Sequence, residues 1–404
     1  MSGCWLSIVG MGEEEGGGID SRAWPLIRDA ELLVGGERHL AAVDAGASTA
    51  ERMVWAQPFG TTVDAILARR GRRVVVLASG DPMEWGVGAT LARHLSASEM
   101  MGLPHPGAYS LAAARLAWPL HAVKRITLHG RPLDRLALFQ QPGTRLLALS
   151  RDGDTPLAVA RWLAARGWGL SEIVVLERLG GPHERQIAAI AAEFPKQRFA
   201  DLNTLAITFR PGSTARVLPR VAGLADECFE HDGQLTKRDV RAATLAKLGP
   251  CDGELLWDIG AGCGSIAIEW LRAEDGAAAI AVEKSLERIR LITRNAAALG
   301  VPELQIIEGE APGALAGLPP PDAVFIGGGL TAETLEVCWQ ALKPGGRLVA
   351  NAVSAEAEAV MLAAYGRLGG ELTRISLTHL KTLGSHHVWR PAMPVCQFST
   401  RKPL

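Results

Sequence analysis

The chain has 404 residues, of which 42 are Lys or Arg and 43 are Asp or Glu, so its formal net charge is −1. This length predicts two or three domains, and the 48 % hydrophobic content excludes a mainly disordered chain. The balanced charge is unlike that of proteins that bind nucleic acids, so no nucleic-acid partner is expected. No apolar run approaches the roughly 18 residues of a membrane span, and no membrane partner is expected.

The six cysteines never occur at C-x-x-C spacing. We therefore expect neither a disulfide framework nor a thiolate metal site. The adjacent pair His386 and His387 has no partner ligand at a useful spacing, so no metal is expected there either. An acidic run at 13–15 directly follows the first apolar residues, which is atypical of a secretory signal. A reducing cytoplasm is the expected compartment.

Short apolar runs that end in glycine or a polar turn indicate buried strands in the first half of the chain. Helical patterns intervene at 155–166 and at 184–193. In the first of these, Pro156 stands just inside the helix start and Asp154 or Thr155 is the expected cap. Alternating strands and helices predict an α/β architecture. The strand signals lie at 5–12, 74–77, 125–128, 145–149, 173–176 and 205–209.

Residues 211–232 lack a clear period and are predicted to link a domain at 1–210 to a domain at 233–404. The second domain opens with a helix, for which Thr236 and Asp239 form a start that resembles a capping box. Two late strands, near 371–377 and 387–398, are expected to pair antiparallel. Between these ends we expect strand 255–259, helix 265–273, strand 279–283, helix 285–298, strand 304–308, strand 322–327, helix 331–342 and strand 346–350.

The most informative motif is DIGAGCG at 258–264, which follows a predicted strand and precedes a predicted helix. Its glycines let the backbone turn sharply and approach a ligand closely, and the helix N-terminus suits a carboxylate. Glu283 ends the next strand about 20 residues further on, where an acidic residue can bind ribose hydroxyls. Together these features predict a nucleotide-type cofactor. Asp258 has a second interpretation, as a strand-end carboxylate that caps backbone N–H groups.

The glycine loop, Glu283 and the segment EGEAP at 308–312 resemble the class I methyltransferases, which use S-adenosylmethionine (SAM). In that family the loop holds the methionine end, the acid holds the ribose and the loop after the third strand flanks adenine. FIGGG at 325–329 and PGGRLVANAV at 344–353 narrow the resemblance to the decarboxylating precorrin methyltransferases. The resemblance implies a SAM site formed by Thr236, Asp258, Gly260, Ala261, Gly262, Cys263, Gly264, Glu283 and Ala311. Thr236 has the alternative role of a helix cap, and Ala311 that of a helix start.

A second series of motifs lies in the first half. It resembles the tetrapyrrole (class III) methyltransferases, in their precorrin carbon-5 branch. The resemblance implies two α/β lobes that clasp SAM, with Gly80, Asp81 and Pro82 beside the cofactor and with Gly10 and Gly12 facing the substrate trough. Taken alone, 80–82 reads as an ordinary strand-ending turn. The motifs are GMG at 10–12, ASGDP at 78–82, PGAYS at 106–110, SRDGDTP at 150–156, ERLGGP at 177–182 and NTLA at 203–206.

The whole chain thus resembles the fused, decarboxylating precorrin C(5,15)-methyltransferases of cobalamin biosynthesis. The fold implied is α/β throughout, with a two-lobed class III domain followed by a Rossmann-like class I domain. The resemblance implies that precorrin-6B gains methyl groups at carbons 5 and 15 and loses the ring-C acetate carboxyl, giving precorrin-8. One SAM site per domain and a homo-oligomer are also implied.

Methyl transfer from a sulfonium to an electron-rich carbon depends mainly on positioning and exclusion of water, so no catalytic residue is assigned. The substrate carries many carboxylates, and Lys237, Arg238 and Arg241 are candidates to bind them. Their alternative interpretation is a solvated basic helix start. Two other functions remain open: a class I methyltransferase that acts on another substrate such as RNA or protein, or one whose N-terminal half only binds corrinoid without catalysis.

Overall fold

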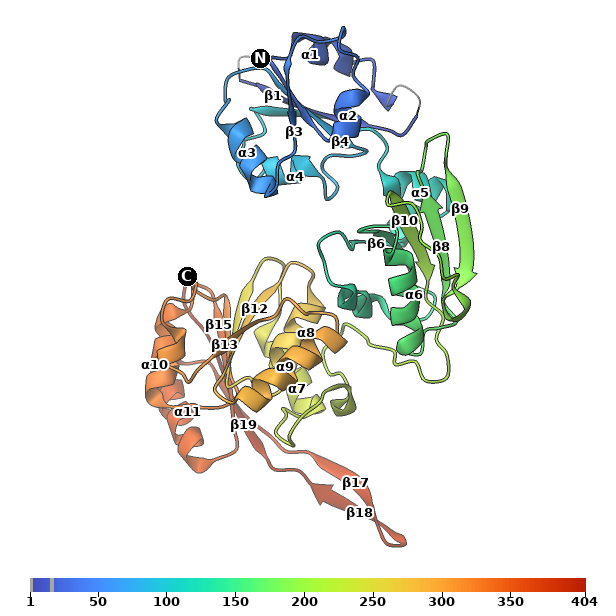
Figure 1. Cartoon of the computed structure of the whole chain (residues 1–404). Coiled ribbons are helices and arrows are strands. Elements are labelled where there is room, and N and C mark those ends of the chain that lie inside the picture. Colours follow the sequence, from blue (N-terminus) through green and yellow to red (C-terminus); the bar gives the residue numbers. More distant parts are fainter. Residues whose placement is uncertain (1–2, 15–17) are drawn as a thin grey trace. The chain divides into compact units, whose positions relative to one another are not determined.

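The computed structural model describes residues 3–14 and 18–404 and divides into two compact units (Figure 1). The first unit runs to Arg131 and includes Gln141–Arg216, whereas the second comprises Pro132–Gln140 and Val217–Leu404. Much of the predicted linker therefore belongs to the second unit. Leu218, Leu224 and Phe229 are buried in its hydrophobic core, and apolar burial of this kind holds a segment in place.

The first sheet of unit 1 is parallel, with strand order β3-β2-β4-β1-β5. Residues on alternate sides of β1 face two separate apolar clusters: Leu6 and Ile8 pack in one, Val9 and Met11 in the other. Burial on both faces is typical of a parallel sheet covered by helices. The elements are β1 (Leu6–Met11), α1 (Ala23–Asp29), β2 (Leu32–Gly35), α2 (Glu37–Ala41), β3 (Glu51–Val54), α3 (Phe59–Leu67), β4 (Val74–Ser79), α4 (Val87–Leu91) and β5 (Met100–Leu103).

The second sheet of unit 1 is mixed, with strand order β6-β7-β10-β8-β9. Its strands β6 and β7 are parallel, whereas β10 and β9 run antiparallel to their neighbours. Helix α6 begins at Thr155 as predicted, after Asp154 and with a proline in its first turn. The elements are α5 (Ala108–Leu116), β6 (Lys124–Thr127), β7 (Arg145–Leu149), α6 (Thr155–Ala165), β8 (Glu172–Glu177), β9 (Arg185–Ile190) and β10 (Asn203–Thr208).

The predicted helix at 184–193 is wrong. Residues Arg185–Ile190 form the edge strand β9, followed by a short 3-10 turn. Each residue of β9 pairs with β8, from Glu177 opposite Arg185 to Glu172 opposite Ile190. Pairing with a neighbouring strand thus decided the conformation of a segment whose own preference is ambiguous.

The sheet of unit 2 has seven strands in the order β13-β12-β11-β14-β15-β19-β16. Strands β13 to β15 are parallel, and β19 runs antiparallel to both β15 and β16. The elements are α7 (Arg238–Leu248), β11 (Leu255–Ile259), α8 (Ser265–Ala273), β12 (Ala278–Glu283), α9 (Leu286–Ala298), β13 (Gln305–Glu308), β14 (Ala323–Ile326), α10 (Ala332–Ala341), β15 (Arg347–Ala352), α11 (Ala355–Leu368), β16 (Glu371–Ile375), β17 (Thr378–Leu383), β18 (His386–Pro391) and β19 (Val395–Arg401).

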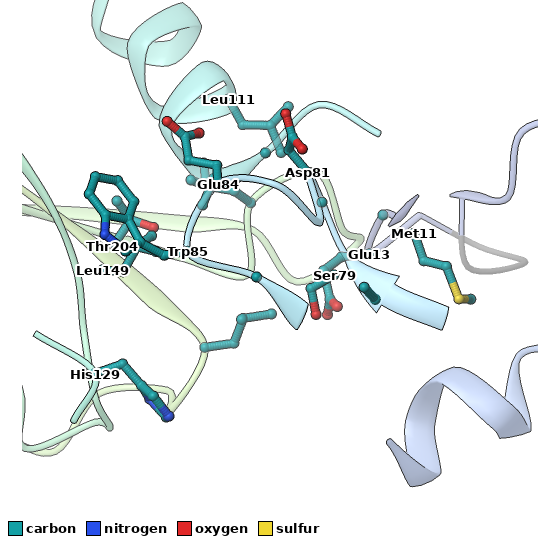
Figure 2. Close-up of a pocket in the computed structure, with 18 of the residues that line it drawn as sticks. Met11, Glu13, Ser79, Asp81, Glu84, Trp85, Leu111, His129, Leu149 and Thr204 are labelled. Atoms are coloured by element: carbon teal, nitrogen blue, oxygen red, sulfur yellow. The ribbon is translucent and has the colours of Figure 1, made fainter. Parts of the chain in front are cut away.

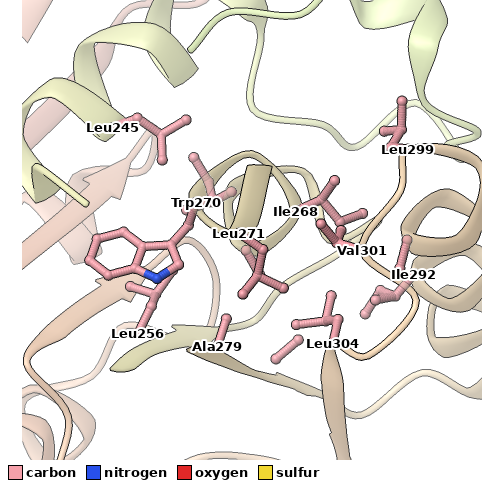
Figure 3. Close-up of a cluster of buried hydrophobic side chains, with 14 of the residues drawn as sticks. Leu245, Leu256, Ile268, Trp270, Leu271, Ala279, Ile292, Leu299, Val301 and Leu304 are labelled. Atoms are coloured by element: carbon pink, nitrogen blue, oxygen red, sulfur yellow. The ribbon is translucent and has the colours of Figure 1, made fainter. Parts of the chain in front are cut away.

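Helices cover both faces of this sheet. Helices α7, α8 and α9 share one apolar cluster with the sheet, and α10 and α11 share the other (Figure 1). Figure 3 shows the first cluster, in which Trp270 and Leu271 of α8 face Leu256 and Ala279 of the strands. The predicted Rossmann-like α/β order is confirmed. No helix in the described part of the chain is long and apolar enough to cross a bilayer.

The sequence analysis did not predict helix α11. The predicted antiparallel pairing of the two late strands is confirmed in part: β16 pairs antiparallel with β19, whose residues 395–398 belong to the second predicted strand. The first part of that predicted strand lies in β18, which forms a separate hairpin with β17. The predicted capping box is wrong. Helix α7 begins at Arg238 after Lys237, with no side-chain capping bond, so Thr236 and Asp239 form no capping box.

Candidate cofactor and substrate sites

Two glycine loops meet at the carboxyl edge of the unit 2 sheet. Gly260 follows β11 with a φ of +66°, and an added Cβ there would lie 2.7 Å from the carbonyl oxygen of Gly328, which follows β14. Only glycine fits such a close approach at a positive φ. Ligands of open α/β sheets bind at this edge, so the structure places the predicted loop where a cofactor would lie.

The rest of the loop leads into α8. Gly264 precedes the helix with a φ of +82°, and its added Cβ would lie 2.9 Å from Ile292 Cγ2. Gly262 differs, since its added Cβ would meet nothing closer than the Gln234 carbonyl oxygen at 3.7 Å. The backbone at Gly262 is therefore open on the side where a ligand could approach.

Two acidic residues flank this loop. Glu283 is 5 % exposed, and its carboxylate accepts hydrogen bonds from the backbone N–H groups of Gly262 (2.9 Å) and Ser285 (3.0 Å). Asp258 is buried, and its Oδ2 accepts a hydrogen bond from the Ala267 amide at 3.0 Å. The capping role of Asp258 is thus present in the structure. Contact of either carboxylate with a cofactor stays a prediction.

Asp258 is electrostatically unusual. Its second oxygen, Oδ1, is buried without a hydrogen-bond partner among the described residues. Burial raises the pKa of Asp258 to about 7; the Ala267 N–H acts against this shift, and the nearby Glu283 carboxylate adds to it. Burial also raises the pKa of the Cys263 thiol, to about 11, so this side chain is a neutral thiol within the loop.

Two predicted cofactor residues lie outside the glycine loop. Thr236 immediately precedes Lys237 and α7, and its carbonyl oxygen accepts a hydrogen bond from Arg241 at 2.5 Å. Ala311 follows β13 and packs partly against the second apolar cluster, and only a short 3-10 turn comes after it. Cofactor contact at both positions, and at Ala261, stays a prediction.

The assignment of Arg241 to substrate binding is overturned. The side chain is fully buried and donates hydrogen bonds to the carboxylates of Glu269 (2.7 Å) and Asp226 (3.2 Å) and to the carbonyl oxygens of Thr236 and Leu224. With its donors engaged inside the unit, Arg241 stabilises the fold around α7 and cannot reach a ligand.

Lys237 and Arg238 remain exposed at the start of α7. The Arg238 Nε donates to the Gly223 carbonyl oxygen at 2.9 Å, and Lys237 lies 4.0 Å from an Asp226 oxygen. Both side chains stay candidates for a substrate carboxylate.

Unit 1 contains a pocket of about 630 Å³. Figure 2 shows Met11 and Ser79 from the first sheet on one side of it and Leu149 and Thr204 from the second sheet on the other. Of the predicted site residues, Gly12, Gly80 and Asp81 line this pocket.

Gly80 makes a close approach like that of Gly260. Its φ is +58°, and an added Cβ would lie 2.9 Å from Gly107 Cα. Asp81 accepts a hydrogen bond from the Met83 amide at 2.8 Å, as in a polar turn. Pro82 follows this turn and is not among the residues that line the pocket.

Gly10 does not face the pocket, contrary to expectation. It lies in β1, and an added Cβ there would be 2.1 Å from the Gly80 carbonyl oxygen and 2.5 Å from the His105 amide nitrogen. Gly10 therefore allows the strand to pack closely against the Gly80 loop.

A polar cluster on the pocket wall escaped the sequence analysis. Ser79 Oγ lies 2.6 Å from Arg38 Nη2 and 3.0 Å from His39 Nε2, and Arg38 also forms an ion pair with Glu13. Burial, with a further contribution from the neighbouring Arg38 charge, lowers the pKa of His39 to about 4, so the imidazole is neutral at pH 7. Ser79 ends β4 and Glu13 follows β1, whereas Arg38 and His39 lie in α2, directly after β2. The sequence alone does not distinguish such positions from surface turns.

Unit 2 is defined as a methyltransferase of the class I type by its parallel sheet, its paired glycine loops and the acid at the end of β12. Unit 1, described by itself, has two sheets around a pocket. A family model for tetrapyrrole (corrin/porphyrin) methylases matches residues 6–195, and one for a precorrin methyltransferase domain matches residues 227–402. The chain is 49 % identical to a precorrin-6Y C(5,15)-methyltransferase (decarboxylating) of Sinorhizobium sp., over 98 % of this chain and 96 % of that protein. The chain belongs to the precorrin-6Y C(5,15)-methyltransferase (decarboxylating) family, which confirms the resemblance.

Two relatives are shorter than this chain. A cobalt-precorrin-7 C(5)-methyltransferase of Salmonella typhimurium is 31 % identical over 47 % of this chain and 94 % of its own length. A probable cobalt-precorrin-6B C(15)-methyltransferase (decarboxylating) of Saccharolobus solfataricus is 34 % identical over 37 % of this chain and 78 % of its own length. Membership in a methyltransferase family implies SAM as the methyl donor.

Proposed function

We propose that this chain methylates precorrin-6B at carbons 5 and 15 and decarboxylates the ring-C acetate, giving precorrin-8. The observation that carries the proposal is the presence of two separate sites in one chain, each built where a pair of glycine loops meet. The names of the shorter relatives support it, since one refers to carbon 5 and the other to carbon 15 with decarboxylation.

We assign carbon-5 methylation to the domain at 1–210 and carbon-15 methylation with decarboxylation to the domain at 233–404, with 211–232 between them. Each domain would bind one SAM. The residues present fit such a cofactor: in unit 2 the backbone at Gly262 is open and Glu283 offers acceptor oxygens nearby, and in unit 1 Gly80 and Asp81 line the pocket.

SAM supplies a methyl group on a sulfonium, which an electron-rich macrocycle carbon can attack directly. The chain's contribution is then to orient the two reactants in line and to exclude water. The α8 N-terminus would attract the carboxylate of the methionine moiety, and the buried Glu283 would accept hydrogen bonds from ribose hydroxyls. Decarboxylation delocalises the electrons of the broken bond into the macrocycle before a proton is added.

Lys237 and Arg238 are proposed to bind substrate carboxylates in unit 2. No metal and no nucleic-acid or membrane partner is part of the proposal, and we place the enzyme in the cytoplasm because its cysteine spacing suits a reducing compartment.

We also propose a homo-oligomer. Its support is the hairpin of β17 and β18, which extends away from the unit 2 sheet (Figure 1) and exposes Leu380 and the opposing Trp389 to 52 % and 70 %. An isolated two-stranded hairpin is only marginally stable in water, and apolar side chains exposed on it favour contact with a second copy.

The direct test incubates the full chain with precorrin-6B and SAM and weighs the product. We expect two added methyl groups and the loss of one carbon dioxide. If the N-terminal half only bound corrinoid, the product would lack the carbon-5 methyl but would still have lost carbon dioxide. Gain of no methyl group would contradict the proposal altogether.

A glycine substitution separates the two halves. Gly262→Arg should abolish carbon-15 methylation and decarboxylation while carbon-5 methylation persists, because the side chain enters the space beside the loop. Gly253→Arg is the matched control: its φ of +77° imposes similar strain, but it lies before β11, at the opposite edge of the sheet, with nothing within 4 Å of an added Cβ. Equal loss in both variants would show that backbone strain, and not the site, causes the effect.

A further inference from the structure

Three neighbouring strand ends bring a cluster of polar side chains to the wall of the unit 1 pocket. Strands β2, β4 and β1 are adjacent and parallel, so their carboxyl ends lie at one edge of the sheet. Arg38 and His39 follow β2, Ser79 ends β4, and Glu13 follows β1. All four residues line the pocket, and Gly80 of the proposed cofactor loop comes directly after Ser79.

The hydrogen bonds of this cluster leave donors available to a ligand. Arg38 Nη2 donates to Ser79 Oγ, and His39 Nε2 lies within hydrogen-bond distance of the same oxygen. The other ring nitrogen, His39 Nδ1, is buried without a partner among the described residues. An unpaired buried N–H is rarer than an unpaired acceptor, so we place the proton of the neutral ring on Nε2, which then donates to Ser79.

The Ser79 oxygen therefore accepts two hydrogen bonds, and its own hydroxyl proton has no acceptor within the cluster. Beside it, the Arg38 guanidinium carries a full positive charge. A hydroxyl donor next to a guanidinium is a combination that suits a carboxylate, which accepts charge-assisted hydrogen bonds on both oxygens.

The structure itself shows a carboxylate in this position. Glu13 forms an ion pair with Arg38, and the two side chains are 27 % and 46 % exposed. The backbone of Glu13 packs against Gly181, where an added Cβ would lie 3.0 Å from the Glu13 carbonyl oxygen. Figure 2 shows Glu13 and Ser79 close together at the same end of the pocket.

We infer that Arg38, Ser79 and His39 form a carboxylate-binding subsite of the unit 1 pocket. In this structure Glu13 engages its Arg38 guanidinium, and one carboxylate of the substrate takes over that place and also accepts from the Ser79 hydroxyl. This inference rests on the proposed carbon-5 methylation. The subsite would hold the macrocycle by a peripheral carboxylate beside the loop at 80–82, and Glu13 would be a competitor that the substrate displaces.

Competition between Glu13 and a substrate carboxylate predicts that removing Arg38 and removing Glu13 change the KM in opposite directions. Arg38→Gln removes the charged donor and should raise the KM for carbon-5 methylation by about tenfold or more, with little change in kcat. Ser79→Ala should raise it by a smaller factor. Glu13→Gln removes the competitor and should lower the KM, by about threefold if Glu13 occupies the subsite two-thirds of the time.

The measurement uses the full chain with precorrin-6B and SAM, and it follows initial rates of carbon-5 and carbon-15 methylation in the same samples. The carbon-15 rate serves as an internal control for folding and concentration. Arg22→Gln and Asp20→Asn are matched controls, because this ion pair of 2.6 Å is exposed and lies outside the pocket lining. Both controls should leave the KM unchanged.

The subsite is refuted if Glu13→Gln raises the KM as Arg38→Gln does, since the pair would then only stabilise the pocket wall. An unchanged KM in Arg38→Gln refutes it as well. If Arg38→Gln lowers the carbon-15 rate through misfolding, the direction of the KM change in Glu13→Gln still decides whether the subsite exists. Failure of the proposed function looks different: the unaltered chain would then add no methyl at carbon 5.

Discussion

Asp258 gives the sharpest test of the physical chemistry of the unit 2 site. We expect Asp258→Asn to stabilise unit 2 at neutral pH and to remove part of its pH dependence. The reason is that the carboxyl group is fully buried, has one oxygen without a partner among the described residues, and has a pKa raised to about 7 by burial.

The sign follows from proton linkage. The unfolded chain ionises Asp258 near its ordinary pKa of about 3.9, whereas the folded chain keeps the proton up to about pH 7. Between these values the folded state binds more protons, so the free energy of unfolding falls as the pH rises. A difference of about 3 pKa units corresponds to about 4 kcal/mol at pH 7 and above. Asn avoids this cost but leaves a buried N–H group unpaired, which costs about 1–3 kcal/mol.

A net gain of about 1–3 kcal/mol is therefore expected at neutral pH. Below about pH 4 the linkage cost of Asp258 disappears and only the unpaired N–H of Asn remains, so a net loss of about 1–3 kcal/mol is expected there. Scanning calorimetry across this range would show the gain as a rise in Tm of about 2–4 °C per kcal/mol for a unit of this size. Lower stability of the Asn variant at pH 7, or an unchanged pH slope, would refute the reasoning.

Asp322, which directly precedes β14 of the same sheet, is the matched control, because its pKa is shifted in the opposite direction from that of Asp258. Burial alone would raise its pKa, but the hydrogen bonds from Lys343 (2.8 Å) and the Leu255 amide (2.9 Å) outweigh burial and hold the pKa below its ordinary value. Its stabilising effect is present above the unfolded pKa and is lost as the pH falls. Asp322→Asn should therefore destabilise unit 2 at pH 7.

Two further variants test assignments made from the structure. Arg241→Met should lower the free energy of unfolding by about 3–5 kcal/mol in urea, because it leaves the buried Glu269 carboxylate without its counter-charge; a stable variant with a raised KM would restore Arg241 to the substrate site. In contrast to Arg241→Met, Arg238→Gln should raise the KM for carbon-15 methylation and leave the free energy of unfolding nearly unchanged. Trp389→Ser should reduce the size of the assembly measured by light scattering. Val221→Ser is the control and should leave that size unchanged, because Val221 is also apolar and 79 % exposed but lies outside the hairpin. An unchanged assembly in the Trp389 variant would contradict the hairpin contact.

Local sequence signals predicted the strand, glycine loop and helix between 255 and 273 because each leaves its own mark: an apolar run, a glycine series and a helical period. Helix α11 was predictable too, since Ser354 caps a segment rich in Ala, Glu and Leu. The edge strand β9 was not, because its conformation depends on pairing with β8.

The site residues likewise fall into those that local sequence predicts and those whose position depends on contacts distant in the sequence. The glycine loop is local and was predicted, and the structure brings it next to Glu283 as expected. The burial of Arg241 depends on Glu269 and Leu224, which lie 28 and 17 residues away in the sequence. The cluster of Arg38, Ser79 and Glu13 likewise exists only because the strand order places three separate strand ends side by side.

The Asn-Ala-Val motif at 351–353, which served only to narrow the family resemblance, gains a physical role from the sheet register. Ala350 of β15 pairs with Ile326 of β14, and Ile326 pairs with Ile259 of β11. The residue after each of these three lies in the next row of the sheet. Asn351 is therefore level with Gly260 and Gly327. Its amide donates to Thr244 Oγ1 of α7 (2.8 Å) and accepts from Gln397 Nε2 of β19 (3.0 Å).

This largely buried network ties α7 to the sheet in the row where both glycine loops leave it. Buried polar networks of this kind hold elements in one relative position when every member is bonded. Helix α7 begins with Lys237 and Arg238, so the network fixes the proposed substrate-binding residues relative to the proposed cofactor loop. Methyl transfer requires such a fixed geometry, because an error of about 1 Å between reacting groups can cost about 100-fold in rate.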